Sequence, residues 1–449
     1  MDVRKESSPN EGTSASRRNE FAGGLMFPWL LSLPSRITTR RGADGVLQLL
    51  SASGAWKLPG ISPEVENALI HGATRERLES WVAAKELASL LYTLTQLDTL
   101  GLLCRSVAGE DGLLATWQPL VEGTAFQESP PLGDISRFAF LRRRKGRSVL
   151  ENPLNSSRVV LWDWRATALF GAYPENPELL PDHQTQALLC LFANCGLTDA
   201  DQDPPLWDFH SLLFHSRSRI GRSLGPHGVG ARAWEEPERP HPPTLSLPRP
   251  HKAELSGTDP SFFEVLERRR SRREQGAIPI SFQQLGEFLW RTAREESGRR
   301  PYPCAGGVYE LEISVIVHRC LGLEPGIYRY HPKAHGLESV ASAGGTLLIE
   351  DAQQACWGDK PPQVLLLLSA RFARMSSKYR NIAYSNILKD VGVVMQTMCL
   401  SASAMNLAAC PIGTGDSDLF CRLLGTEYGQ ESSVGELILG TPPDELKES

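Results

Sequence analysis

A proline-rich segment constrains the folding of this chain more than any other feature. Seven prolines lie between Gly225 and Thr258, namely Pro226, Pro237, Pro240, Pro242, Pro243, Pro248 and Pro250. Proline fixes φ and lacks an amide donor, so this stretch is not expected to form a regular helix or a central strand. It predicts a semi-rigid linker over residues 225–258, which separates an N-terminal half from a C-terminal block.

The composition is that of an ordinary globular protein with several domains. The 449 residues exceed what one hydrophobic core usually supports, and 41% of them are hydrophobic. With 47 Lys+Arg against 52 Asp+Glu and a pI of about 6.1, the chain gives no reason to expect a nucleic-acid partner. Nine scattered cysteines, never spaced as C-x-x-C, predict reduced thiols in a cytoplasmic protein.

No stretch of the sequence predicts a cleaved signal or a membrane segment. Residues 1–23 are polar and have few apolar positions, so we expect them to be a disordered tail. The longest apolar runs, such as residues 364–370, are far shorter than the roughly 20 residues that a spanning helix needs. We therefore expect no membrane partner.

The N-terminal half contains a weak tandem repeat. Residues 37–51 and 138–152 each place two β-prone runs around a charged turn that contains glycine, a pattern typical of a hairpin. Each hairpin precedes an apolar helix start, and Ser62 followed by Pro63 suits the N-cap and first position of the first helix. The sequence therefore predicts the same local fold twice.

A second pair of helices supports the repeat. Two apolar stretches with helical spacing align on Gly101 and Gly196, each placed as a C-cap glycine. The alignment sets Leu94 against Leu189, Leu97 against Phe192 and Leu102 against Leu197. We predict two small α+β units of winged-helix type, over residues 24–116 and 117–224. The alternative is that similar amphipathic helices recur by chance, because helix boundaries read from sequence shift by several residues.

The C-terminal block alternates helices and strands, which predicts an α+β domain over residues 259–449. A first helix should start at Asp259-Pro260 and bury Phe262, Phe263 and Leu266. A second should start at Ser281, which can form a capping box with Gln284. Strands are expected at residues 311–318, 326–331, 364–370 and 434–440. The long helix, from about residue 384 to 409, is apolar or small on nearly every face, so it should lie in a core or a subunit interface.

A cluster of guanidinium groups follows the first helix of this block. The run from residue 267 to 273 includes Arg269, Arg270, Ser271 and Arg273. Bidentate charge-assisted bonds from arginine, beside a serine hydroxyl, can offset the desolvation of a phosphomonoester dianion. The alternative is a solvated helix end, where arginine is favourable because of the helix dipole.

Two glycine-containing loops could bring backbone amides against a ligand. Residues 303–310, PCAGGVYE, precede a predicted strand, and residues 411–418, PIGTGDSD, follow the long helix. Adjacent glycines allow the backbone to approach a flat or anionic ligand closely. Neither loop is a Walker A motif or a G-x-G-x-x-G after a strand, so nucleoside triphosphate and Rossmann-type binding are not expected. An ordinary turn is the alternative for each.

A lysine and a tyrosine stand together between an apolar strand and the long helix. Lys378 and Tyr379 lie in the segment SSKYRNIAY, residues 376–384. Desolvation disfavours the ammonium form, so a lysine at the edge of an apolar site can act as a base. The tyrosine adds a proton donor or acceptor. The alternative is an ordinary surface lysine.

No metal site is predicted. His331 and His335 are four residues apart, but Pro332 between them argues against a helical metal face. The basic run of residues 142–147, on the second hairpin, is interpreted as a solvated turn, although an acidic peptide could use it.

Together these motifs resemble a known enzyme family. In this order, R-R-S-x-R, A-G-G-x-Y-x-L-E, L-x-P-G-I-Y-R-Y and K-Y-R resemble the flavin-dependent azoline dehydrogenases of ribosomal peptide biosynthesis, which have the nitroreductase fold. SRFAFLRRR, VVLWDWRATAL and WDFHSLLFHSRSRIGR are similar to the cyanobactin thiazoline oxidases, in which two winged-helix-like peptide-recognition domains precede the flavin domain. The resemblance extends from about Leu25 to Gly440. One departure is Cys304, where the family usually has serine, which removes a hydroxyl but keeps the backbone amides.

The resemblance implies a cofactor, roles for individual residues and an assembly. The cofactor would be FMN. Its phosphate and its ribityl or pyrimidine oxygens would be bound by Arg269, Arg270, Ser271 and Arg273. The isoalloxazine would be lined by Pro303, Cys304, Ala305, Gly306 and Gly307, and closed on its other side by Gly413, Thr414 and Gly415. Lys378 would be the catalytic base and Tyr379 its partner. The buried helix would form the core of a homodimer with the flavin at the subunit interface.

The function that the resemblance implies is oxidation of a thiazoline, or an oxazoline, in a modified ribosomal peptide to the aromatic azole. A base would remove the ring proton alpha to the carbonyl while hydride leaves the neighbouring carbon, and dioxygen would reoxidise the flavin. One alternative is an NAD(P)H-dependent flavin reductase of a small molecule, which the two N-terminal units argue against. Another is a non-catalytic peptide-binding scaffold, which the intact Lys378, Tyr379 and arginine cluster argue against.

Overall fold

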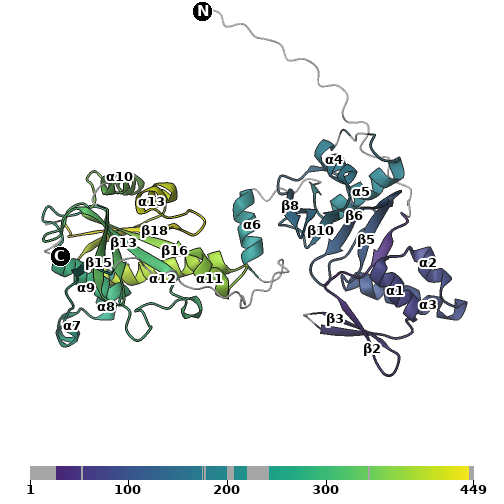
Figure 1. Cartoon of the computed structure of the whole chain (residues 1–449), viewed down its shortest axis with the longest axis horizontal. Coiled ribbons are helices and arrows are strands. Elements are labelled where there is room, and N and C mark those ends of the chain that lie inside the picture. Colours follow the sequence, from purple (N-terminus) through teal and green to yellow (C-terminus); the bar gives the residue numbers. More distant parts are fainter. Residues whose placement is uncertain are drawn as a thin grey trace, which may run out of the picture. The chain divides into compact units, whose positions relative to one another are not determined.

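The chain folds into two compact units. The computed structural model describes residues 27–51, 54–173, 175, 178–199, 207–219, 242–341 and 344–443. The first unit is Met1–Leu224 and the second is Gly225–Ser449 (Figure 1). Both contain helices and sheets, so the predicted α+β class is confirmed. No helix in the described ranges is long and apolar enough to cross a bilayer.

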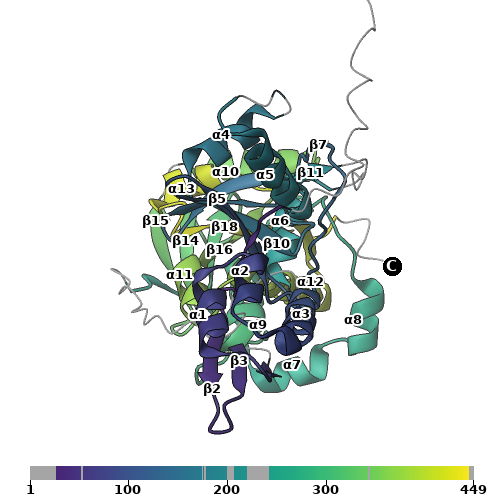
Figure 2. The same ribbon diagram turned by 90° about the vertical axis from the view of Figure 1, so that its right-hand side faces the viewer.

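The first unit is built on a six-stranded sheet in the order β1-β5-β6-β10-β9-β8, with a separate three-stranded sheet β2-β3-β4. Its strands are β1 Leu30–Ser32, β2 Thr38–Arg41, β3 Leu47–Ser51, β4 Gly54–Leu58, β5 Cys104–Gly109, β6 Gly112–Pro119, β7 Asp134–Ile135, β8 Phe140–Arg144, β9 Arg147–Glu151, β10 Ser157–Leu161 and β11 Thr198–Asp199. Its helices are α1 Pro63–His71, α2 Arg75–Ser80, α3 Ala84–Thr99, α4 Trp164–Ala172, α5 Asp182–Asn194 and α6 Phe209–Ser218. Figure 2 shows α1, α2 and α3 gathered beside the β2–β3 hairpin.

The predicted repeat is visible in this unit. The meander β2-β3-β4 precedes α1, and the meander β8-β9-β10 precedes α4. Both predicted hairpins are therefore confirmed, and so is the Ser62 cap of α1. Helices α3 and α5 also end alike, because Leu102 N donates to Leu97 O at 2.7 Å and Leu197 N donates to Phe192 O at 3.0 Å. This six-residue closure is the Schellman ending, which needs the left-handed glycine that Gly101 and Gly196 supply.

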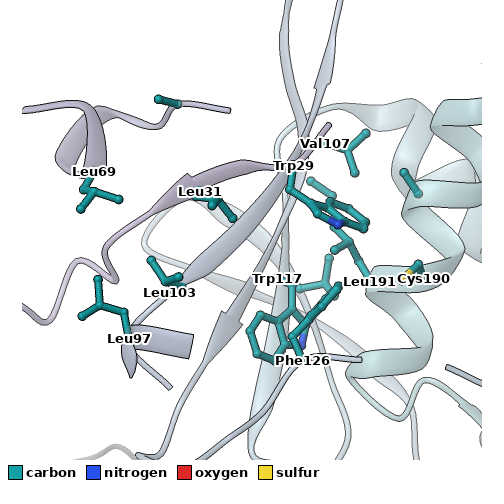
Figure 3. Close-up of a cluster of buried hydrophobic side chains, with 14 of the residues drawn as sticks. Trp29, Leu31, Leu69, Leu97, Leu103, Val107, Trp117, Phe126, Cys190 and Leu191 are labelled. Carbon is teal, nitrogen blue, oxygen red and sulfur yellow. The ribbon is translucent and has the colours of Figure 1, made fainter. Parts of the chain in front are cut away.

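One hydrophobic core runs through the first unit. Trp117 of β6 contacts Phe126 edge to face, with ring centroids 5.0 Å apart, and Phe126 in turn contacts Trp29 (Figure 3). Leu97 of α3 and Leu191 of α5 belong to the same buried cluster. The strands on both sides of the predicted 116/117 boundary lie in one sheet. The division into two peptide-recognition domains stays a prediction.

The second unit is a seven-stranded antiparallel sheet with helices on both faces. The strand order is β12-β15-β14-β13-β16-β18-β17, with β12 Leu245–Ser246, β13 Leu311–Val317, β14 Gly326–His331, β15 Gly336–Ala341, β16 Val364–Arg371, β17 Ala408–Ile412 and β18 Glu431–Gly440. Its helices are α7 Lys252–Thr258, α8 Phe262–Arg268, α9 Phe282–Ala293, α10 Gly345–Ala355, α11 Phe372–Lys378, α12 Ala383–Ala404 and α13 Ser417–Leu424.

Strand β16 shows why this sheet is buried on both faces. Alternate side chains of a strand point to opposite faces. Leu366 and Leu368 pack in the cluster that contains α9 and α12, whereas Leu365 and Leu367 pack in the cluster that contains α10 and α13. The unbroken apolar run predicted at residues 364–370 therefore serves two cores. Figure 1 shows the two helix pairs on opposite sides of the sheet.

Three expectations for the second unit need correction. Helix α8 is capped by Ser261, through a capping box with Glu264, and not by Asp259. Its predicted buried side chains are exposed instead, at 68% for Phe262, 72% for Phe263 and 43% for Leu266. Helix α12 ends at Ala404 and not near residue 409, because residues 408–412 pair with β18 as strand β17.

Part of the predicted linker is folded. The first residues of the segment, up to 241, lie outside the described residues, but residues 242–258 belong to the second unit. Leu245 and Ser246 pair with β15 at the sheet edge, and α7 forms in the part of the segment that has no proline. Leu247 is buried in the main core of the unit.

The basic run on the second hairpin is also more than a solvated turn. Arg142 Nε donates to Glu151 at 2.8 Å, and Arg217 of α6 donates to the same carboxylate at 3.0 Å. The Glu151 carboxylate is buried, so these two guanidiniums neutralise a charge that burial would otherwise make costly.

Candidate functional site

The first predicted glycine loop lies at the start of the central strand β13. Residues 305–307 form a single 3-10 turn, in which Gly306 and Gly307 have φ values of 61° and 63°. Tyr309 also has a positive φ, of 51°, and its amide donates to Cys304 Sγ at 3.0 Å. The left-handed backbone is why glycine is needed at two successive positions. The loop exposes Gly306 and Gly307.

The predicted lysine–tyrosine pair meets this loop. Lys378 is the last residue of α11, whose Met375 is fully buried and anchors the helix in the core. Lys378 Nζ donates to the Gly306 carbonyl at 2.5 Å. A methyl group added to Gly306 would lie 2.6 Å from the Tyr379 hydroxyl and 2.7 Å from Lys378 Nζ. The two polar groups therefore stand side by side against one face of the loop.

The arginine segment lies beside β17. It follows α8, where Arg269 is the C-cap residue, and Arg272 N donates to Ala409 O at 2.9 Å. Arg270, Ser271 and Arg273 are exposed, and Arg269 is half-buried. Arg272 itself, which the motif R-R-S-x-R passes over, has a buried Nη1 with no hydrogen-bond partner among the described residues.

The second glycine loop continues from the end of the same strand. Gly413, Thr414 and Gly415 are exposed and follow Ile412, the last residue of β17. Gly415 lies over the side chain of Glu436, where an added methyl group would come within 2.3 Å of the carboxylate. Burial raises the pKa of Glu436 to about 7, with a smaller contribution from the charge of Asp351. Strand β17 thus brings the arginine segment and this loop to one neighbourhood.

Helix α12 connects the two groups of predicted residues. Asp390, in its first half, accepts the amide of Ala305 at 3.0 Å from the first glycine loop. In its second half, Ser403 Oγ donates to Val265 O of α8 at 3.2 Å, and α8 leads into the arginine segment. Asp390 and Ser403 are thirteen positions apart, about 20 Å along a helix axis. The site is therefore extended, with amides and a lysine towards one end and guanidiniums towards the other.

Two buried carboxylates were not predicted from the sequence. Glu310, fully buried, and Asp390 both contact Cys304 Sγ, at 3.2 Å and 3.1 Å. Burial, with a smaller contribution from the nearby Asp390 charge, raises the pKa of Glu310 to about 7. Burial, reinforced by Glu310, also raises the pKa of the Cys304 thiol. We call Cys304, Glu310 and Asp390 the acid cluster.

The acid cluster has the spacing of a metal site, since its three ligand atoms lie within 4.8 Å of one another. Two of its three members are already engaged, because both Asp390 oxygens accept the Ala305 amide and Cys304 Sγ accepts the Tyr309 amide, whereas Glu310 Oε1 has no hydrogen-bond partner among the described residues. The expectation of no metal stays a prediction. His331 and His335, the other pair considered, bind different partners, Glu338 and Pro248.

Comparison with known proteins agrees with this architecture. Residues 266–441 match the nitroreductase family, so the second unit carries a nitroreductase domain. Residues 134–224 match the model named cyanobactin oxidase ThcOx. The chain therefore combines a nitroreductase-family domain with a cyanobactin-oxidase segment, and the resemblance seen in its motifs is confirmed.

Individual relatives cover parts of the chain. A Methanocaldococcus jannaschii protein provisionally named nitroreductase MJ1384 is 29% identical over 154 residues, which are 33% of this chain and 77% of that protein. The crystal structure of a provisionally named nitroreductase from Ralstonia eutropha JMP134 is 20% identical, covers 46% of this chain and 97% of its own, and has a TM-score of 0.38. The E. coli microcin synthetase McbBCD complex with truncated pro-MccB17 is 20% identical, covers 39% of this chain and 71% of its own, and has a TM-score of 0.35.

Proposed function

We propose that this protein is an FMN-dependent azoline dehydrogenase that oxidises thiazoline or oxazoline rings of a ribosomally made peptide. The observation that carries the proposal is the placement of Lys378 and Tyr379 against the Gly306 loop, in a chain that also holds a cyanobactin-oxidase segment. A nitroreductase domain supports an oxidoreductase, and the second segment supports a peptide substrate.

The residues present fit FMN. The buried Nη1 of Arg272 has no hydrogen-bond partner within the described ranges, and Arg270, two positions earlier, is exposed, which suits a phosphate dianion. Gly307 and Gly413 have open space where a side chain would stand, so a flat ligand can approach their backbone. We infer that Arg269, Arg270, Ser271 and Arg273 hold the phosphate end. The first glycine loop, Pro303 to Gly307, would line the ring system, with Gly413, Thr414 and Gly415 opposite.

The chemistry that FMN supplies when bound is acceptance of the hydride that aromatisation releases. The protein has to remove the ring proton alpha to the carbonyl and to keep it away from the reacting carbon. Lys378 Nζ, held by the Gly306 carbonyl, is placed to take that proton when the amine is neutral. The Tyr379 hydroxyl, beside it, can orient the amine or relay the proton.

The first unit would capture the peptide. Strand β8 is an edge of the six-stranded sheet, and β2 and β4 are the edges of the small sheet. An extended peptide can add to such an edge, so that main-chain hydrogen bonds supply affinity. Arg143 and Arg144, at the end of β8, would favour an acidic segment of the peptide.

A homodimer would cover the exposed face of α8. Phe262, Phe263 and Leu266 place three large apolar side chains on one short helix that leads into the arginine segment. Exposed apolar clusters of this kind mark interaction sites. We propose that a second copy of the chain packs on this face and that the flavin lies near the resulting interface.

The test is direct turnover. The purified protein, reconstituted with FMN, should remove two hydrogen atoms from a thiazoline-containing peptide, as seen by mass spectrometry, and the same peptide should bleach the flavin absorbance under anaerobic conditions. Flavin bleaching by NAD(P)H, without any change in thiazoline or oxazoline peptides, would instead support the small-molecule reductase. Recovery of FAD as the released chromophore would contradict the cofactor assignment.

A further inference from the structure

The acid cluster joins three separate parts of the second unit. Cys304 belongs to the first glycine loop, Glu310 stands immediately before β13, and Asp390 lies on α12. Cys304 Sγ is the common centre, since it lies 3.2 Å from Glu310 Oε2 and 3.1 Å from Asp390 Oδ2. Glu310 and Asp390 are both almost inaccessible to solvent, and Glu310 Oε1 has no hydrogen-bond partner among the described residues.

Among the described residues no cation forms an ion pair with Glu310 or Asp390, although Arg300 acts electrostatically on the Cys304 thiol. The Arg300 guanidinium donates to the Tyr302 hydroxyl and the Leu311 carbonyl, and it faces Glu295. Arg371 pairs with Glu312 and Glu431, and Lys378 donates to Gly306. Two carboxylates so close together, out of water and without a cation, cannot both ionise at low cost.

The surroundings of the two carboxyl groups differ. Asp390 accepts the Ala305 amide on both oxygens, at 3.2 Å and 3.0 Å. The Glu310 carboxylate accepts its own backbone amide, but burial outweighs this bond, and the pKa of Glu310 is raised to about 7. Below a pH of about 7 the Glu310 carboxyl therefore holds a proton.

We propose that Glu310 and Asp390 are positioning residues that share one proton with the Cys304 thiol and thereby fix the loop that holds Lys378. The connection is continuous. Asp390 accepts the Ala305 amide, and the carbonyl of the next residue, Gly306, accepts from Lys378. At the end of the loop, Cys304 Sγ accepts the Tyr309 amide. The proposal rests on the proposed function only in assigning proton transfer to Lys378.

Loss of the shared proton should disturb the loop. When Glu310 ionises, a second negative charge faces Asp390 across one sulfur atom, and the electrostatic repulsion acts on the residues that anchor Ala305 and Tyr309. The reductive half-reaction should therefore slow above a pH of about 7, where Glu310 loses its proton. Glu310→Gln, which keeps a neutral side chain of the same shape, should remove that pH dependence.

A flavin-free measurement tests the shared proton first. Infrared difference spectra of the apoprotein, wild type minus Glu310→Gln, should show the carbonyl band of a protonated carboxyl at pH 6 that is lost by pH 8.5. The matched control is Glu312→Gln, which changes a buried glutamate two residues away that is paired with Arg371. The spectrum of wild type minus Glu312→Gln should lack this band, because the variant keeps the Glu310 carboxyl. Absence of the band from the wild-type-minus-Glu310→Gln spectrum overturns the proposal.

The pH profile of single-turnover flavin reduction tests the positioning. As pH rises through about 7, the rates of wild type and Glu312→Gln should fall relative to the rate of Glu310→Gln measured at the same pH. An unchanged profile in Glu310→Gln overturns the positioning role. If the wild-type protein binds one equivalent of metal and Cys304→Ser does not, the shared proton is overturned. A positive infrared result without peptide turnover refutes the proposed function and not the proton sharing.

Discussion

A methyl group at position 306 should separate the catalytic pair from the loop. Gly306→Ala places its Cβ 2.6 Å from the Tyr379 hydroxyl and 2.7 Å from Lys378 Nζ. Ordinary contacts of this kind are no closer than 3.4 Å, so these groups have to move by about 0.8 Å. A displacement near 1 Å from a productive geometry can cost about 10²-fold in rate. We expect a loss of about that size in single-turnover flavin reduction by a thiazoline peptide.

Gly307→Ala is the matched control. Gly307 has nearly the same φ as Gly306, 63° against 61°, so alanine at either position carries a similar left-handed penalty of about 1 to 2 kcal/mol. A methyl group on Gly307, however, meets nothing within 4 Å. Both variants should lose similar stability in urea denaturation, while Gly307→Ala should stay within a few-fold of the wild-type rate. Equal rates in the two variants, at equal FMN content, would refute the assignment of Lys378 and Tyr379.

Three further outcomes are expected. Arg270→Ala should weaken FMN binding at least about tenfold in fluorescence titrations, because a charge-assisted bond is worth about 1.5 to 3 kcal/mol, and Arg268→Ala, at the exposed end of α8, should not. Glu436 binds its proton more tightly in the folded state, so the free energy of unfolding should fall by up to about 3 kcal/mol as pH rises from about 4.5 to 7. Glu436→Gln should remove this fall when the free energy of unfolding is measured in urea at each pH. Phe263→Ser should shift the protein from dimer to monomer in light scattering at low concentration; an unchanged mass would leave α8 out of the interface.

Local sequence signals predicted the parts of the fold that local contacts determine. Ser281 and Gln284 form the expected capping box at the start of α9. The turn between β8 and β9 uses Lys145 and Gly146, both with positive φ, within the run predicted to be a hairpin turn. The lysine–tyrosine pair and the first glycine loop were also found by sequence and lie together. Each motif alone suited a surface lysine or an ordinary turn, so it was the resemblance to a known family that grouped them, and their roles stay a prediction.

Features that depend on distant partners were missed. Glu310 and Asp390 are eighty positions apart, and neither sequence neighbourhood indicates that they meet at Cys304. The amphipathic pattern of α8 identified an apolar face, but the pattern cannot tell whether the same chain covers that face. Apolar residues at 408–412 suit a buried helix as well as a buried strand, and only pairing with β18 distinguishes the two.

The central claim is that Lys378 transfers the proton during ring oxidation. Its most direct test is single-turnover reduction of the FMN-loaded Lys378→Ala variant by a thiazoline peptide. The control is Lys360→Ala, which changes an exposed lysine of the same unit. General acid–base catalysis contributes about 10² to 10⁴-fold, so Lys378→Ala should lose that factor while its FMN content stays at the wild-type level. A reduction rate near that of wild type would contradict the account.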